Sequence, residues 1–180
     1  ATSNQLLLKL IDDILDMSKI EAGTLNFSYT EVDINTMLFD IHQQFIIKNH
    51  NPNIQVKFTD RLPELIIRTD RCRISQVMTN FLNNALKFTK QGSITFGYRL
   101  CPNKEIYFFV KDTGIGIPKD KTEEVFERFI RLNEHMKGTG LGLSICRVII
   151  EHLKGHIGVK SEEGKGSEFW FRLPSAVIVK

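Results

Sequence analysis

The chain has 180 residues, of which 42% are hydrophobic, which is enough for the core of one compact domain with some residues left for an appendage. Its formal charge of +3 arises from 24 basic and 21 acidic residues dispersed along the chain, a pattern that argues against nucleic acid as a partner. The chain has neither an apolar run near the roughly 20 residues that cross a bilayer nor a secretory leader pattern, and its three separated cysteines, without a CxxC pair, favour a reducing cytoplasm over disulfides or zinc.

The first predicted element is an amphipathic helix that ends near Gly23. Its apolar residues recur at helical spacing: Leu7, Leu10, Ile11 and Ile14. Such a stripe either packs on its own domain or pairs with another helix, and the spacing does not separate these two interpretations. Position 1 is Ala rather than Met, so we expect the chain to be a piece of a longer protein.

Helices and short strands alternate through the rest of the chain. Helical periodicity predicts helices over 34–47, 71–88 and 140–154, and β-rich runs predict strands over 55–58, 65–68, 93–100, 105–112, 156–161 and 167–173. The order lacks the regular βαβ rhythm of a doubly wound sheet. We therefore expect a mixed sheet that is covered on one face by helices.

Two glycine clusters stand about twenty residues apart, DTGIGIP at 112–118 and GTGLGL at 138–143. The second cluster is not a dinucleotide fingerprint, because Leu143 occupies the place of the final glycine, and the chain contains no P-loop. Flanking glycines would let backbone N–H groups approach a phosphate at the start of the helix near Gly140. The alternative is a glycine-rich turn that only reverses the chain.

Polar residues near these clusters fit the binding of an adenine nucleotide. Asp112 ends an apolar strand beside the turn that Gly114 and Gly116 permit, where its carboxylate could accept a hydrogen bond from an exocyclic amine. Asn80, Asn84 and Lys87 share one helical stripe. An amide oxygen on Mg²⁺ and a lysine on a phosphate would explain this stripe, although it could also be a solvated face.

Five stretches of the sequence resemble known motifs in order and spacing. NFLNNALKFT (80–89), DTGIGIP (112–118), FERFIR (126–131), GTGLGL (138–143) and GKGSEF (164–169) resemble the asparagine, first glycine, phenylalanine, second glycine and third glycine boxes of the sensor histidine kinases of two-component systems. LIDDILDMSKIEAG (10–23) resembles the end of the second helix of that family's dimerisation and phosphoacceptor hairpin.

This resemblance implies an α/β fold, a two-layer sandwich whose mixed β-sheet is covered on one face by helices and preceded by an N-terminal helical arm. Residues 1–24 would be the end of the phosphoacceptor hairpin, residues 25–176 the ATP-binding catalytic domain and residues 177–180 a tail or linker. ATP would lie between the helix layer and a lid at 119–137, with the two glycine clusters as the hinges of that lid.

The resemblance also implies roles for particular residues. Asp112 would bind the adenine amine, with Gly114 and Gly116 shaping its pocket, and Asn84 would ligate Mg²⁺ with support from Asn80. Lys87 and Arg131 would approach the triphosphate. The second glycine cluster would hold phosphate, through Gly138, Thr139, Gly140, Leu141 and Gly142. Phe126 and Phe129 would anchor the lid or serve as plain core residues.

Position 80 separates two kinds of chemistry. Hydrolases of this fold place a glutamate four residues before the Mg²⁺ asparagine, whereas this chain has Asn80, and an amide cannot act as a general base. ATP should therefore be held for an outside nucleophile, as in a protein histidine kinase. None of the five histidines precedes an acidic residue as the family's acceptor does, so we expect no autophosphorylation by this chain alone.

The expected function is transfer of the ATP γ-phosphate to a histidine, for relay to a response-regulator aspartate in two-component signal transduction. Expected partners are the phosphoacceptor hairpin of the same or a partner protomer, a receiver domain and a second copy in a full-length homodimer. The expected location is the cytoplasmic portion of a membrane-associated sensor. The alternatives are an ATPase-type conformational module of the same superfamily and a non-enzymatic nucleotide sensor.

Overall fold

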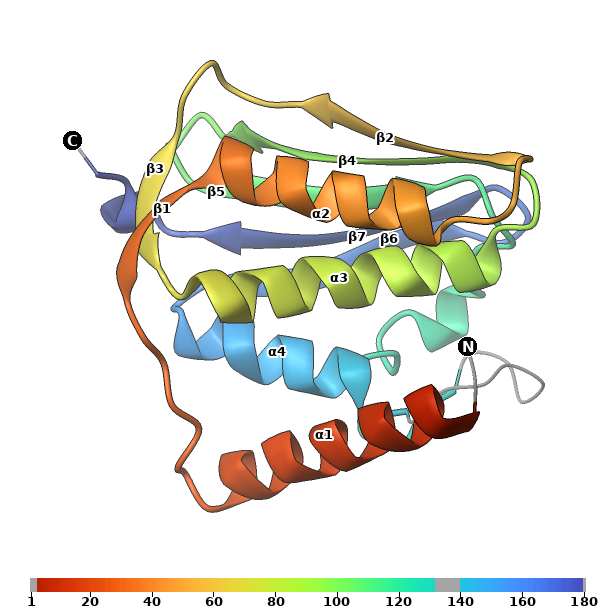
Figure 1. Cartoon of the computed structure of the whole chain (residues 1–180), viewed down its shortest axis with the longest axis horizontal. Helices are drawn as coiled ribbons and strands as arrows, with labels where there is room; N and C mark the ends of the chain where they lie inside the picture. Colours follow the sequence, from red (N-terminus) through yellow and green to blue (C-terminus); the bar gives the residue numbers. More distant parts are fainter. Residues whose placement is uncertain (1–2, 132–139, 180) are drawn as a thin grey trace.

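A computed structural model of the chain describes residues 3–131 and 140–179 (Figure 1). The helices are α1 (Ser3–Glu21), α2 (Ile34–Lys48), α3 (Arg71–Phe88) and α4 (Gly142–His152), with short 3₁₀ turns η1 (Lys119–Lys121) and η2 (Ser175–Val177). The strands are β1 (Thr30–Asp33), β2 (Ile54–Asp60), β3 (Ile66–Thr69), β4 (Gly92–Leu100), β5 (Ile106–Asp112), β6 (His156–Glu162) and β7 (Gly166–Leu173).

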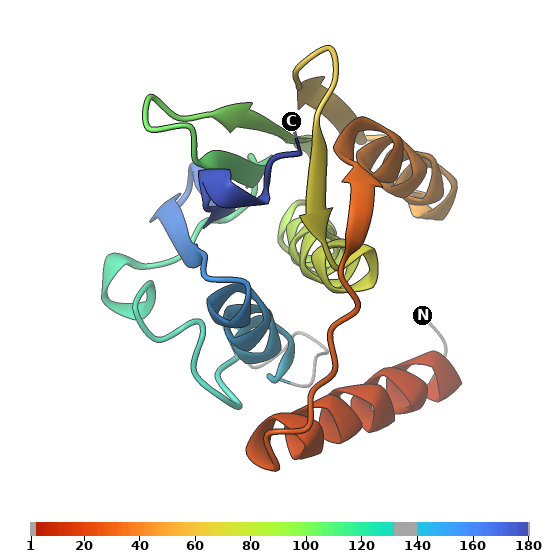
Figure 2. The same cartoon turned by 90° about the vertical axis from the view of Figure 1, so that its left-hand side faces the viewer.

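The main sheet has five strands in the order β2-β4-β5-β7-β6. The β2–β4 pair is parallel and the other three pairs are antiparallel, so the sheet is mixed as predicted. Helices α2, α3 and α4 cover one of its faces (Figures 1 and 2). The antiparallel pair of β1 and β3 forms a small second sheet, whose strand β1 the sequence analysis did not predict.

Local chemistry explains where the helices begin and which way they face. The side chains of Asp33 and Asp70 cap α2 and α3 by accepting hydrogen bonds from the backbone N–H groups of Thr36 and Arg73. The apolar stripe of α3 is fully buried against the sheet, as its periodicity predicted: Ile74, Val77, Met78, Phe81, Leu82 and Ala85. The polar stripe on the opposite side of α3 does not contribute to this core and is available for other contacts.

The N-terminal arm α1 docks on the catalytic domain beside α3 and α4 (Figure 2). Asp13 and Met17 are buried there, and Asp16 accepts a hydrogen bond from Gln76 of α3 at 3.0 Å. The other side of α1 stays exposed although it is apolar, with 37–62% of each residue accessible: Leu7, Leu8, Leu10, Ile11, Ile14 and Leu15. The arm thus packs on its own domain and also presents an unpaired apolar face. Within the described ranges, no helix is both long enough and apolar enough to cross a membrane.

Candidate nucleotide site

The polar stripe of α3 forms the floor of the candidate site. Asn80 and Asn84 are half-buried and Lys87, one turn further on, is exposed. Neither amide side chain forms a hydrogen bond with any residue in the described part of the chain. Two half-buried amides without partners are available to a ligand or an ion. The Mg²⁺ ligation expected of Asn84, with support from Asn80, stays a prediction.

Asp112 lies at the end of β5, at one side of this floor. Only 3% of the residue is exposed, and its Oδ1 accepts a hydrogen bond from the Gly114 N–H at 2.9 Å. Burial raises the pKa of Asp112, and the backbone N–H groups of Gly114 and Ser167 act in the opposite direction. The site therefore holds a buried carboxyl group that would gain from a further hydrogen-bond donor.

The first glycine cluster ties this carboxyl group to the end of α3. A Cβ on Gly114 would stand 2.3 Å from the Phe88 carbonyl oxygen, so only glycine permits this approach. Gly116 has φ +70° and lies against the Glu162 carbonyl, which makes glycine the residue that fits there as well. The loop is held between α3 and the β6–β7 turn, and this holds Asp112 close to the polar stripe.

The second glycine cluster reaches the same stripe from the other side. Gly140 has φ +72°, and its carbonyl accepts a hydrogen bond from the Phe129 N–H at 2.7 Å. Because of this left-handed residue, α4 begins at Gly142 rather than at the predicted Gly140. A Cβ on Gly142 would lie 2.4 Å from the Asn80 amide nitrogen, so Asn80 touches the start of α4, where helical N–H groups favour an anion.

Besides Gly140 and Gly142, the second glycine cluster contains three residues that were predicted to bind phosphate. Leu141 is 2% exposed and packs in the core, so only its backbone can take part in binding. Gly138 and Thr139, which were also predicted to bind phosphate, lie outside the residues that the structure describes.

Positive charge gathers at the Lys87 end of the site. The pKa of Lys87 is lowered, first by partial burial and then by the charges of Lys9 and Arg131. Lys87 and Arg131 were predicted to act together, and the structure brings their charges close to each other. Lys9 was missed, because nothing in the spacing of the first helix indicates which of its residues face the catalytic domain. Lys9 is already paired with the Asp13 carboxylate at 2.9 Å, so Lys87 and Arg131 are the cations that would attract a polyphosphate.

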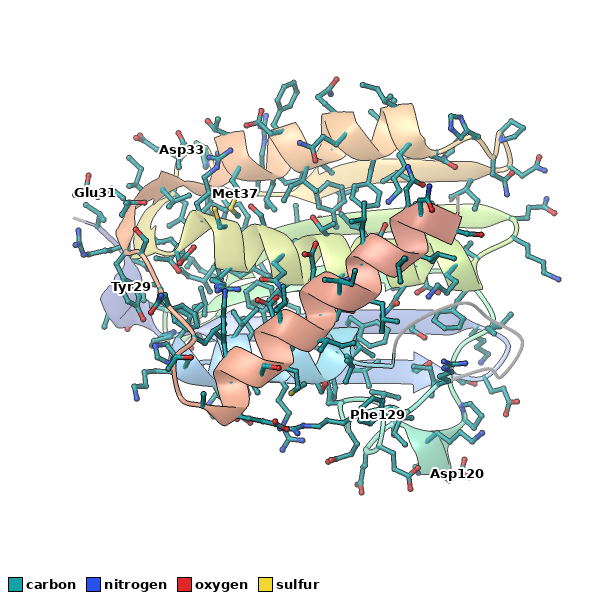
Figure 3. The ribbon with its side chains drawn as sticks, turned by 60° about the horizontal axis from the view of Figure 1, so that its bottom comes forward. Tyr29, Glu31, Asp33, Met37, Asp120 and Phe129 are labelled. Atoms are coloured by element: carbon teal, nitrogen blue, oxygen red, sulfur yellow. The ribbon has the colours of Figure 1, made fainter. Side chains whose placement is uncertain are left out.

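The two lid phenylalanines behave differently. Phe126 is buried and its ring packs edge-on against Phe169, with 6.3 Å between the ring centroids, as expected of an anchor. Phe129 is 71% exposed, with φ +63°, in the loop near α1 (Figure 3). The expectation that Phe129 anchors the lid or serves as a core residue is wrong for this arrangement, because so exposed a ring buries little apolar surface.

Thr89 was not singled out by the sequence analysis. Its hydroxyl is buried, has no hydrogen-bond partner in the described part of the chain, and lies against Gly114. An unpaired buried hydroxyl beside the Asp112 turn is a further polar group available to a ligand. Its place at the end of NFLNNALKFT was the only signal in the sequence.

Comparison with known proteins agrees with this geometry. Residues 69–177 match the model of the histidine kinase-, DNA gyrase B-, and HSP90-like ATPase family. The chain is 32% identical over 95% of its length to the sensory/regulatory protein RpfC of Xanthomonas campestris pv. campestris, and 36% identical over 96% to the sensor histidine kinase RcsC of Salmonella typhimurium. It spans 25% of the length of RpfC and 19% of RcsC.

Solved structures show the same fold. The chain superposes with a TM-score of 0.85 on full-length ShkA in complex with AMPPNP, at 32% identity, covering 93% of this chain and 35% of ShkA. The catalytic domain of histidine kinase ThkA gives a TM-score of 0.72 at 32% identity, covering 82% of this chain and 96% of that domain. The chain belongs to the histidine kinase-, DNA gyrase B-, and HSP90-like ATPase family. Within this family, the chain is similar to the catalytic domains of sensor histidine kinases, as the sequence motifs predicted.

Proposed function

We propose that this chain is the part of a sensor histidine kinase that binds ATP and transfers its γ-phosphate to a histidine outside the chain. The observation that carries the proposal is the contact between Asn80 and the start of α4, which puts a neutral amide where a hydrolase of this fold would need a base. Without a base to deprotonate it, water would attack the bound nucleotide slowly, and the γ-phosphate would stay available to an imidazole.

The residues around the polar stripe suit each part of the nucleotide. Asp112 would accept a hydrogen bond from the adenine amine, in a pocket that Gly114 and Gly116 keep narrow. Gly140 and Gly142 would offer backbone N–H groups to the phosphates at the start of α4. ShkA, which shares this fold at 32% identity, was solved with AMPPNP, and this supports ATP as the ligand of this site.

The donor set also suits Mg²⁺. The described residues contain no cluster of three His, Cys, Asp or Glu side chains that could hold a metal ion by themselves. Mg²⁺ binds neutral oxygens and keeps phosphate and water ligands, so the free amide oxygen of Asn84 would suffice as its protein ligand. The metal would neutralise charge on the phosphates.

The chain's own groups would act on the transfer by alignment and charge. Lys87 and Arg131 would hold the triphosphate so that an imidazole nitrogen attacks the γ-phosphorus in line with the bond to the β–γ bridging oxygen. A P–N bond would form, ADP would leave, and the imidazole would lose its proton. A receiver-domain aspartate would take the phosphoryl group next, in a cytoplasmic assembly built on a homodimer.

The decisive experiment incubates the chain with γ-labelled ATP and Mg²⁺, with and without a separate phosphoacceptor hairpin. We expect label on the histidine of the added hairpin and little free phosphate without it. Steady phosphate release without any acceptor would instead indicate the ATPase-type module. Tight ATP binding that never labels an acceptor would indicate a nucleotide sensor.

A further inference from the structure

The face of the main sheet that points away from the helices carries both aromatic and cationic side chains. Alternation along the strands directs Phe108 and Phe171 toward the helices and Tyr107, Phe109 and Trp170 to the other side. Tyr107 and Phe109 are nevertheless only 7% and 5% exposed. Something other than a helix therefore covers them.

Cationic side chains form this cover. The Arg99 guanidinium lies 4.9 Å from the Tyr107 ring centroid and 5.3 Å from that of Phe109. The Lys160 ammonium lies 5.5 Å from the Tyr107 centroid, and the Arg172 guanidinium 5.1 Å from that of Trp170. Lys111 and Lys160 flank Glu168 in the strand register, and both lysines are exposed. We call Arg99, Lys111, Lys160, Trp170 and Arg172 the outer face.

Most of these cations lack an anionic partner. Lys111, Lys160 and Arg172 form no ion pair with any described residue, and Arg99 has only Asp60 at 3.7 Å. The carboxylate of Glu168 already accepts a hydrogen bond from the Tyr107 hydroxyl at 2.5 Å. The outer face therefore carries an excess of positive charge that the described chain does not balance.

Two nitrogen donors on the same face are also without partners. The indole nitrogen of Trp170 and the Nε of Arg172 are buried, and neither makes a hydrogen bond in the described part of the chain. Native proteins pair nearly all such donors. Because the Arg172 guanidinium lies over the indole, a carboxylate that drew it outward would give Arg172 an acceptor and uncover Trp170.

We propose that the outer face docks an acidic protein segment whose carboxylates pair with Arg172, Lys160 and Lys111. Single-stranded nucleic acid fits less well, because base stacking needs open aromatic faces and Tyr107 and Phe109 are covered. Glu168, in the middle of the face, would also repel a continuous run of phosphates. Carboxylates spaced along a polypeptide can pair with the cations on either side of it.

Trp170 is the only tryptophan of the chain, so its fluorescence reports on this face alone. We would titrate the intact chain with short poly-L-glutamate at low ionic strength and follow the tryptophan emission. The unmodified chain should give a saturable change that weakens with added salt. The double variant Arg172→Glu with Lys160→Glu should weaken binding by about tenfold or more, and Arg172→Lys should fall between the two.

Lys48→Glu provides the control for charge reversal elsewhere, because it reverses one charge on α2, on the helix-covered side of the sheet, and is compared with Arg172→Glu alone. It should leave the poly-L-glutamate affinity nearly unchanged, and nucleotide binding by each variant checks its fold. An unchanged emission would overturn the proposal, as would an equal loss with Lys48→Glu. Tighter binding of oligothymidylate than of poly-L-glutamate would show that the face takes nucleic acid instead.

Discussion

Asp112 is a buried carboxyl group, and its burial is unfavourable for the stability of the fold. A carboxyl group that is 3% exposed loses most of its hydration, and the Gly114 N–H supplies only part of what is lost. A residue that served stability alone would be better replaced by an apolar or neutral group. A buried carboxyl group at the end of β5, on the side of the half-buried amides of α3, therefore supports our proposal that a ligand donates a hydrogen bond to it.

Replacing Asp112 by Asn should weaken adenine nucleotide binding by about tenfold to a hundredfold, because an uncharged amide is a weaker acceptor than a carboxylate and its NH2 group can meet the proposed adenine amine donor to donor. Isothermal titration calorimetry with an ATP analogue measures the change. Asp12→Asn, on the exposed side of α1, is the control and should bind as the unmodified chain does. Unchanged affinity in Asp112→Asn would remove the residue from the adenine pocket.

The same carboxyl group makes stability depend on pH. Since burial raises the pKa of Asp112, the folded chain holds this proton more tightly than the unfolded chain does. The stabilisation is complete below the ordinary aspartate pKa and is lost as the pH rises through the raised value. The free energy of unfolding of the unmodified chain, minus that of Asp112→Asn, should therefore fall as the pH rises from the ordinary aspartate pKa through the raised pKa of Asp112. Denaturant unfolding followed by tryptophan fluorescence would show this, whereas a constant difference would contradict it.

Asn84 can be tested separately from the rest of the pocket, because its proposed partner is a metal. Asn84→Ala should lower the affinity for ATP strongly in Mg²⁺ and only slightly in EDTA, since the amide oxygen would act on the metal and not on adenine. Asn83→Ala is the matched control, because Asn83 is the neighbouring asparagine and its amide oxygen already accepts a hydrogen bond from Lys48 of α2. Equal losses in the two buffers would exclude Asn84 as a ligand.

At the scale of elements, the arm α1 is held by a polar contact that can be removed. Asp16 accepts a hydrogen bond from Gln76 and stands 3.6 Å from Arg73, with both charged side chains less than a fifth exposed. Asp16→Ala should cost about 1 kcal/mol and act mainly on the docking of α1. Hydrogen exchange should then quicken along α1 while α3 keeps its protection. Equal acceleration in both helices would mean that the arm and the domain open as one unit.

The elements that were predicted correctly are those whose secondary structure is specified by the pattern of residues within one short segment. The stripe of α3 and the alternation in β4 and β7 repeat over consecutive residues, and β5 is a short continuous apolar run. The glycine clusters mark turns that the backbone requires. Strand β1 escaped prediction because it has four residues with a single buried one, Val32, and exists only by pairing with β3. The position of Lys9 and the exposure of Phe129 depend on how α1 and the lid dock, which spacing along one segment does not contain.

At the scale of the molecule, the two faces of α1 serve different contacts. Asp13, Asp16 and Met17 lie on the side that meets the catalytic domain, while Leu7, Ile11 and Ile14 share a stripe on the opposite side. Figure 3 shows the arm lying across the helix layer. The three residues of that stripe are 44–55% exposed. Contiguous exposed apolar surface of this kind marks an interaction site. A second α1 would cover it without disturbing the nucleotide floor on α3.

We therefore expect the chain to self-associate through α1, and charge on the exposed stripe to prevent this. Ile11→Glu combined with Ile14→Glu should shift the species seen by sedimentation velocity from dimer toward monomer, because a dimer would bury two carboxylates without partners on each helix. Ile47→Glu is the control, since Ile47 is 76% exposed on α2 and far along the chain from the arm. It should sediment as the unmodified chain does, and ATP-analogue affinity should stay unchanged in both variants. If the unmodified chain remains monomeric at every concentration tested, or if Ile47→Glu dissociates the dimer equally, then the outward face of α1 is not where two copies meet.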